Sequence, residues 1–329
     1  MRNAKIISTG MYVPENIIPN SYFDEILGEN VSEWLEANVH IRNRRWCSDN
    51  QSTANLCGEA AKINLKRAGL RPEDIDLLIV CTDTPEYISP STASKVQHRM
   101  GMTNAGTFDL NSACAGFVIG LDTAVKYIKA DENYTNVMVI GAYAMSKYLN
   151  ELDKKTCNLF ADGAGAVILS LTDDENEGYL ASELRTKGEY CDWMGIYAGG
   201  THQPVTKEVV ENNDHLLKFV KRFPSELNPD VWSDMARTLA SRSATKIEEV
   251  DQFIFTQINI NSIWATLEKL DISRDKAHTV MHEYGYTGSA CIPMALDEAV
   301  QLGKVKKGDL IYFIGSGGGL AFASAAFRF

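Results

Sequence analysis

The apolar residues of the chain follow two alternating patterns. Continuous apolar runs of strand length, such as Leu77–Cys81 and Val137–Gly141, precede stretches whose apolar residues recur at the 3.6-residue spacing of a helix. In the stretch after Gly116, the positions with this spacing are Phe117, Leu121, Ala124, Val125 and Ile128. The alternation predicts an α/β fold with mostly parallel strands.

The same order of segments occurs twice along the chain. The apolar run that begins at Asp76 has a counterpart that begins at Asp251, an offset of 175 residues. The helical stretch around Leu121 matches the stretch around Leu296 at the same offset. Two independent segments with one offset indicate an internal duplication rather than a chance similarity between two buried strand–helix units.

A third pair of runs, which end at Gly141 and Gly315, repeats at an offset of 174 residues. A chain of 329 residues exceeds the usual size of a single core, so either two domains or one large fold built from two similar halves is expected. The repeat places the boundary after residue 172, which gives an N-terminal half of residues 1–172 and a C-terminal half of residues 173–329.

Composition and charge exclude some functions. The chain is 45% hydrophobic and 23% charged, which is typical of a globular protein. Its net charge of -11 argues against broad binding to nucleic acid or to an anionic membrane, because both need a basic face. No apolar run approaches the roughly 18 residues of a membrane span, and the first residues lack the apolar core of a signal peptide. We therefore expect a cytoplasmic location.

Seven cysteines are scattered without a CxxC pair, so neither a zinc site nor a redox motif is predicted. Most cysteines of this kind are small buried hydrophobic residues. Cys114 differs, because Gly106–Ala113 reads as a strand with a sharp turn and a helical stripe follows directly. The free N–H groups at a helix start favour an anion, so we expect a lowered thiol pKa. The residues alone leave both a catalytic thiol and a packed core thiol open.

A duplicated α/β fold brings two equivalent strand-to-helix turns close together, and such turns are where α/β folds bind ligands. Cys114 occupies one of these turns, and Ser289 occupies the matching turn of the second half. Both turns are therefore expected beside one pseudo-twofold axis.

Several motifs resemble one enzyme family. The segment Asn111–Phe117 (NSACAGF) is similar to the nucleophile motif of the β-ketoacyl-acyl carrier protein synthase III family. Ile6–Pro14 resembles the first strand and turn of that family, Phe160–Ala166 its glycine-rich strand, and Gly315–Leu320 with the terminal Phe327-Arg-Phe its end. The order and spacing of these motifs make the resemblance specific.

The resemblance implies a thiolase-like five-layer αβαβα sandwich and a homodimer. It implies that Cys114 carries an acyl group as a thioester, received from acyl-coenzyme A or from acyl carrier protein. Coenzyme A or phosphopantetheine would arrive as part of the substrate, so no separate cofactor and no metal are expected. The family works in fatty acid biosynthesis and so in lipid metabolism.

The sequence departs from the family at two catalytic positions. Thr256 stands where the family has a His, and Tyr286 stands where it has an Asn. The family uses this pair to stabilise the enolate that forms when a malonyl extender loses CO2. His282 is an alternative source of an imidazole. The oxyanion hole implied by the resemblance consists of the backbone amides of Cys114 and Gly318, which side-chain changes do not remove.

The substrate entrance also differs. Trp34 matches the family's adenine-stacking Trp, and Asn259 matches its pantetheine-binding Asn. Asn38 and Asn261, however, replace two Arg residues that serve coenzyme A and the acidic carrier protein. A carrier protein has an alternative docking site in a basic cluster on a predicted helix, formed by Lys218, Lys221 and Arg222, although such a cluster is equally typical of a solvated face.

Three functions remain open at this stage. The first is an acyltransferase that loads Cys114 and passes the acyl group to an acceptor other than malonyl, such as an amine or a hydroxyl. The second is an ordinary decarboxylative synthase with a rebuilt pocket. The third is a non-catalytic subunit of a heteromeric synthase, which the intact Cys114 and Gly317–Gly319 argue against.

Overall fold

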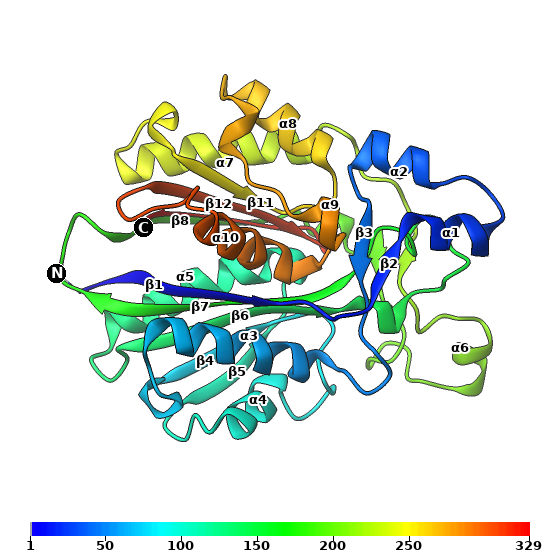
Figure 1. Cartoon of the computed structure of the whole chain (residues 1–329), viewed down its shortest axis with the longest axis horizontal. Coiled ribbons are helices and arrows are strands. Elements are labelled where there is room, and N and C mark those ends of the chain that lie inside the picture. Colours follow the sequence, from blue (N-terminus) through cyan, green and yellow to red (C-terminus); the bar gives the residue numbers. More distant parts are fainter. Residues whose placement is uncertain (1) are drawn as a thin grey trace.

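The computed structural model describes residues 2–329 and shows two stacked β-sheets with helices between and outside them (Figure 1). The first sheet has the strand order β1 (Asn3–Tyr12), β7 (Asp162–Thr172), β6 (Asn136–Ala144), β4 (Leu77–Cys81) and β5 (Gly106–Leu110). The second has the order β8 (Gly178–Thr186), β13 (Ala321–Arg328), β12 (Leu310–Gly317) and β11 (Gln252–Phe255).

The helices form three layers around these sheets (Figure 1). The middle layer consists of α5 (Gly116–Ala130) and α10 (Cys291–Gln301). One outer layer consists of α3 (Thr53–Ala68) and α4 (Thr92–Met100), and the other of α7 (Leu227–Ser243) and α8 (Ile260–Lys269). Helix, sheet, helix, sheet and helix layers therefore stack in the order that the family resemblance implied.

The apolar stripe after Gly116 explains why α5 lies in the middle layer. Its predicted residues are all fully buried, and further apolar side chains such as Val118 extend the buried surface around the helix. A helix that is apolar on more than one face needs partners on both sides, which the two sheets provide. The largest core cluster of the molecule accordingly includes α5, α10 and the inner faces of both sheets.

Shorter elements gather at one end of the sandwich, on the right in Figure 1. They include α1 (Asn20–Leu27), α2 (Ser32–Val39), α6 (Lys207–Glu211), α9 (Met281–Tyr284) and the strand pairs β2 (Ile17–Pro19) with β3 (Asn43–Arg45) and β9 (Met194–Gly195) with β10 (Lys218–Phe219). Two single 3-10 turns, η2 (Ala113–Ala115) and η7 (Gly288–Ala290), lead into α5 and α10. No helix among residues 2–329 combines the length and the apolar character that a membrane crossing needs.

The predicted duplication is confirmed by the sheet topology. The order β1-β7-β6-β4 in the first sheet corresponds to β8-β13-β12-β11 in the second, with the same parallel and antiparallel pairings. The place of β5 in the second sheet is taken by one parallel bridge between Phe253 and Ala277. The predicted boundary after residue 172 coincides with the end of β7.

The prediction of mostly parallel strands is wrong, because four of the seven pairings in these sheets are antiparallel. Along the chain, β7 follows β6 in the first half and β13 follows β12 in the second. Each of these pairs lies side by side in its sheet, and no α-helix connects the two strands. The β12–β13 turn spans only residues 318–320, too short for a parallel crossover. A strand buried on both faces is a continuous apolar run whether its neighbour is parallel or antiparallel. The sequence pattern therefore did not reveal the strand direction.

Glycines on the central strands allow each half to touch the turn of the other. A Cβ on Gly141 of β6 would lie 2.2 Å from the carbonyl oxygen of Ser289, in η7 of the second half. A Cβ on Gly317 of β12 would lie 2.6 Å from the backbone nitrogen of Cys114, in η2 of the first half. Any larger residue at either position would force these backbones apart.

We therefore expect Gly141→Ala to lower the free energy of unfolding by about 3 kcal/mol or more, because the new methyl group overlaps backbone that has no free space to move into. Gly188→Ala is the matched control, since a Cβ on exposed Gly188 meets no atom within 4 Å. Its effect should stay within about 0.5 kcal/mol. Urea denaturation measures both, and equal midpoints for the two variants would contradict the close approach.

Candidate active site

Cys114 occupies the centre of η2, directly before α5, which is the position that the sequence predicted. Its side chain is only 2% exposed. Ala113 has a positive φ of 46°, and its amide donates to the Asn111 side chain at 3.0 Å, which fixes the sharp turn between β5 and the helix. The strand, the turn and the helix start thus hold the sulfur between the two halves.

The ionisation of Cys114 differs from the expectation. Burial raises the pKa of the thiol well above its usual range, and the nearby Asp83 carboxylate raises it further. A hydrogen bond with the Tyr286 hydroxyl lowers the pKa, but by less than burial raises it. The predicted lowering by the helix start is therefore outweighed, because a thiolate loses its hydration at this depth.

Two cavities meet at Cys114. The first, here called the Asn259 cavity, has a volume of about 270 Å³ and is lined at the sulfur by Cys114, Tyr286 and Gly318 and further out by Asn259, Lys155 and Arg222. The second, the Asp83 cavity, has a volume of about 250 Å³. Its lining shares Cys114, Gly318 and Met194 with the first and adds Asp83. The thiol is therefore accessible from two directions.

Tyr286 and Thr256 are placed differently. Tyr286 is 1% exposed, lines the Asn259 cavity and packs against Phe160 at a ring-centroid distance of 5.4 Å. Thr256 does not appear in the described lining of either cavity. Its hydroxyl accepts a hydrogen bond from the Ser316 amide at 3.0 Å and lies 3.3 Å from the Ser316 carbonyl. The geometry thus brings Tyr286 to the thiol and ties Thr256 to the backbone of β12.

A hydrogen bond connects α2 to α8. The Asn261 side chain donates to the Asn38 carbonyl at 2.8 Å, and the Asn38 side chain donates to the Trp34 carbonyl at 3.0 Å. Trp34 is 56% exposed, and its predicted stacking role stays a prediction. Asn259 caps the start of α8 by accepting from the Asn261 amide at 3.0 Å.

The predicted basic cluster is not helical, which corrects the sequence interpretation. Lys218 lies in β10, which pairs with β9, and residues 220–226 are irregular. Phe219 pairs with Met194 in this ladder, and Phe219 and the following Phe223 line the Asn259 cavity. Lys221 stacks on Trp193 at 4.0 Å, and Lys218 pairs with Asp214. Arg222 alone of the three lines the cavity.

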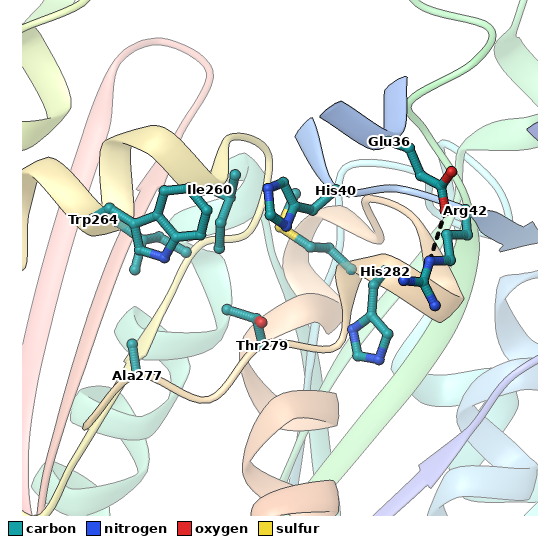
Figure 2. A pocket seen from close by; sticks show the side chains of 10 residues that line it. Glu36, His40, Arg42, Ile260, Trp264, Ala277, Thr279 and His282 are labelled. Carbon is teal, nitrogen blue, oxygen red and sulfur yellow. Dashed lines mark ion pairs between the residues drawn. The ribbon is translucent and has the colours of Figure 1, made fainter. Parts of the chain in front are cut away.

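His282 lies in a different pocket. Figure 2 shows its imidazole beside Arg42, which forms an ion pair with Glu36, and across the pocket from Trp264. His282 is the second residue of α9, and it lines neither described cavity at Cys114. The structure thus gives no support to His282 as a replacement imidazole.

Sequence reasoning missed Asp83 and Tyr143, both of which line the Asp83 cavity. Asp83 follows the apolar run of β4, at the carboxyl end of a strand with parallel neighbours on both sides. That position is where α/β sheets place functional side chains, so the signal was available. Within residues 2–329, no three His, Cys, Asp or Glu side chains are grouped so that they could hold a metal ion.

The duplicated fold and the buried thiol where its halves meet define the class of protein as thiolase-fold condensing enzymes. Residues 108–188 match the family described as 3-oxoacyl-[acyl-carrier-protein] synthase III, and residues 240–329 match the C-terminal part of that family. The chain belongs to this family, which is also called the β-ketoacyl-acyl carrier protein synthase III family.

Individual relatives span the whole chain. A β-ketoacyl-[acyl-carrier-protein] synthase III of Natranaerobius thermophilus is 34% identical and one of Clostridium perfringens is 36% identical, and each alignment covers 100% of both chains. The crystal structure of 3-oxoacyl-[acyl-carrier-protein] synthase III from Aquifex aeolicus has a TM-score of 0.89 at 33% identity, covering 99% of this chain and 100% of that chain. The similarity therefore includes both halves and the turn that carries Cys114.

The contact between Tyr286 and Cys114 is testable. We expect Tyr286→Phe to slow alkylation of Cys114 by iodoacetamide roughly 10- to 100-fold at a fixed pH, because a hydrogen bond to a charged group contributes about 1.5–3 kcal/mol. Mass spectrometry of the Cys114 peptide measures the rate, and exposed Cys191 serves as an internal standard. Tyr197→Phe, in the other cavity, is the matched control. Equal rates in both variants would rule out the hydrogen bond.

Proposed function

We propose that the protein transfers acyl groups through Cys114 to an acceptor other than a malonyl thioester. In the first step, the Cys114 sulfur attacks the carbonyl of an acyl thioester. A new sulfur–carbon bond forms, the bond to the donor sulfur breaks, and the departing thiol takes a proton. In the second step, an amine or hydroxyl of the acceptor attacks the acyl carbon, the bond from that carbon to the Cys114 sulfur breaks, and the acceptor's proton returns to the sulfur.

The two cavities suggest how the substrate lies. The resemblance assigns Asn259 to the pantetheine arm, so the donor would enter through the Asn259 cavity. Exposed Lys155 and Arg222 at this cavity would attract the phosphates of coenzyme A or of a carrier protein's phosphopantetheine. The Asp83 cavity, on another side of the same sulfur, is then left for the acyl group. Both backbone amides of the implied oxyanion hole, at Cys114 and Gly318, belong to this junction.

One observation carries the choice of acceptor: among the described lining residues of both cavities, none is a histidine. Loss of CO2 from a malonyl thioester needs donors that stabilise the enolate. Tyr286 supplies a single hydroxyl, whose pKa burial raises well above its usual value, and the Thr256 hydroxyl bonds to Ser316. An acceptor that brings its own nucleophile needs no enolate stabilisation.

A second candidate function is decarboxylative condensation, as in fatty acid or polyketide-type biosynthesis. It is favoured by the names of the full-length relatives, which are called β-ketoacyl-[acyl-carrier-protein] synthase III at 34–36% identity. In that case Tyr286 would be the principal side-chain donor to the enolate.

We further propose that the chain acts as a homodimer, as the family resemblance implies. Static light scattering at micromolar concentration should give twice the monomer mass of 36.4 kDa. A monomer under these conditions would contradict it.

Acylation of Cys114 is the first test of the proposed function. Intact-protein mass spectrometry after incubation with short-chain acyl-coenzyme A should show one added acyl group, and Cys114→Ala should abolish it. Cys291→Ala is the matched control, because Cys291 is also buried near a helix start but lines neither described cavity. An unchanged acyl adduct on Cys114→Ala would refute the assignment.

The second test concerns the acceptor. With acylated enzyme and malonyl-acyl carrier protein, CO2 release should stay well below roughly 1 s⁻¹, because the loss of even one preorganised donor typically costs ~10²- to 10³-fold. Thr256→His combined with Tyr286→Asn should raise the rate modestly, since both new side chains must fit a fully packed site. Turnover of roughly 1 s⁻¹ or faster by the unmodified protein would establish the decarboxylative function instead.

A further inference from the structure

The Asp83 cavity has a largely apolar wall, with Asn111, Tyr143 and Tyr197 as its neutral polar residues. Its larger apolar side chains are those of Met145, Met194, Ile196 and Leu217. Asp83 supplies the one formally charged side chain in the described lining. The volume of about 250 Å³ falls just below the roughly 300–1,000 Å³ of pockets for drug-sized ligands, which suits a short acyl group.

The segment that carries Asp83 is fixed on both sides. The Thr84 amide donates to the Thr82 hydroxyl at 3.0 Å, and the Ala144 amide donates to the Thr84 hydroxyl at 2.9 Å. Both threonines are nearly fully buried. The intervening side chain is thus held at the cavity and is not a mobile surface residue.

The carboxyl group lacks a partner within the protein. The Asp83 residue as a whole is half-buried, but its Oδ1 atom is fully buried and has no hydrogen-bond donor among residues 2–329. Burial raises the pKa of Asp83 to about 6, and its own backbone N–H is the one contact that opposes this rise. The titratable groups around it are Cys114, Tyr143 and Tyr148, and Cys191 and Tyr197 lie in the same lining. None of them is a cation.

A hydrocarbon chain in this cavity would leave the carboxylate without hydrogen bonds and remove any water from it. A buried acceptor left unpaired costs about 1–3 kcal/mol, and more when it is charged. A ligand with its own donor would avoid this cost. We propose that Asp83 makes the cavity selective for short acyl groups that carry a hydrogen-bond donor, either a hydroxyl or an ammonium group. This inference rests on the proposed acylation of Cys114 and specifies which acyl group is loaded.

The test compares three coenzyme A thioesters of similar size as donors to Cys114: 3-hydroxybutyryl, β-alanyl and butyryl. Second-order rates of acylation come from intact-protein mass spectrometry at pH 7.5. At least one donor-bearing acyl group should load roughly 10- to 100-fold faster than butyryl. A preference for 3-hydroxybutyryl alone identifies a hydroxyl as the ligand group, and a preference for β-alanyl alone identifies an ammonium group.

Two substitutions of Asp83 separate charge from hydrogen bonding. Asp83→Leu should abolish or reverse the preference, since the described lining then has no charged side chain. Asp83→Asn should lose any preference for β-alanyl and keep part of that for 3-hydroxybutyryl. Asp192→Asn is the matched control, because it removes an exposed carboxylate next to Cys191 without changing the described lining. Equal loading of all three thioesters, or an unchanged preference in Asp83→Leu, would overturn the inference while leaving the acylation itself intact.

Should Cys114 accept no acyl group at all, the proposed function fails separately. Isothermal titration calorimetry of Cys114→Ala with the same three thioesters then compares their binding affinities as ratios of Kd.

Thermal unfolding gives an independent measure that does not need a substrate. A carboxyl whose pKa is raised on folding destabilises the native state at pH values above that pKa. This destabilisation disappears as the pH falls below the pKa that the carboxyl has in the unfolded chain. Asp83→Asn should therefore have a higher Tm than the wild type at pH 7, and the difference should shrink between about pH 6 and pH 4. A lower Tm for Asp83→Asn at pH 7 would mean that the carboxylate has a partner within the protein and would overturn the inference.

Discussion

The contact between a strand of one half and a turn of the other holds the molecule together at its functional centre. Gly317 of the second sheet lies against the backbone of Cys114, and Gly141 of the first sheet lies against that of Ser289. Because neither contact leaves room for a Cβ, the depth of Cys114 is set by backbone packing rather than by flexible side chains. The thiol, the Gly318 amide and both cavities depend on this packing. Neither half could form the site alone.

Burial explains the electrostatics of the site. The same low-dielectric environment raises the pKa of Cys114, Asp83 and Tyr286, so every additional negative charge here is costly. The raised pKa keeps Cys114 a neutral thiol, and the proposed acyl-enzyme is neutral as well. The proposed acylation therefore adds no net charge to this buried environment.

The sequence predicted the features that depend on local patterns and failed on those that depend on long-range assembly. The repeat and the turn that carries Cys114 follow from apolar periodicity and spacing, and the five layers from the family resemblance. Strand direction, the extended Lys218 and the raised pKa of Cys114 do not, because pairing partners and burial are set by residues distant in the chain. The Asp83 cavity was missed for the same reason, since its wall combines segments near residues 83, 143, 194 and 217. The placement of Thr256 and Tyr286 in the family's His and Asn positions stays a prediction.

The neutral hydrogen bond between α8 and α2 bears on how the proposed donor would arrive. The Asn261 side chain of α8 donates to the Asn38 carbonyl of α2, whereas Lys155 and Arg222 at the opening of the Asn259 cavity carry full charges. Salt screens charges and leaves neutral amide contacts nearly unaffected. The shape of the opening should thus be the same in dilute and concentrated buffer, while the frequency of productive encounters with a phosphate-bearing donor changes. Ionic strength would act on diffusion toward the entrance and not on the site behind it.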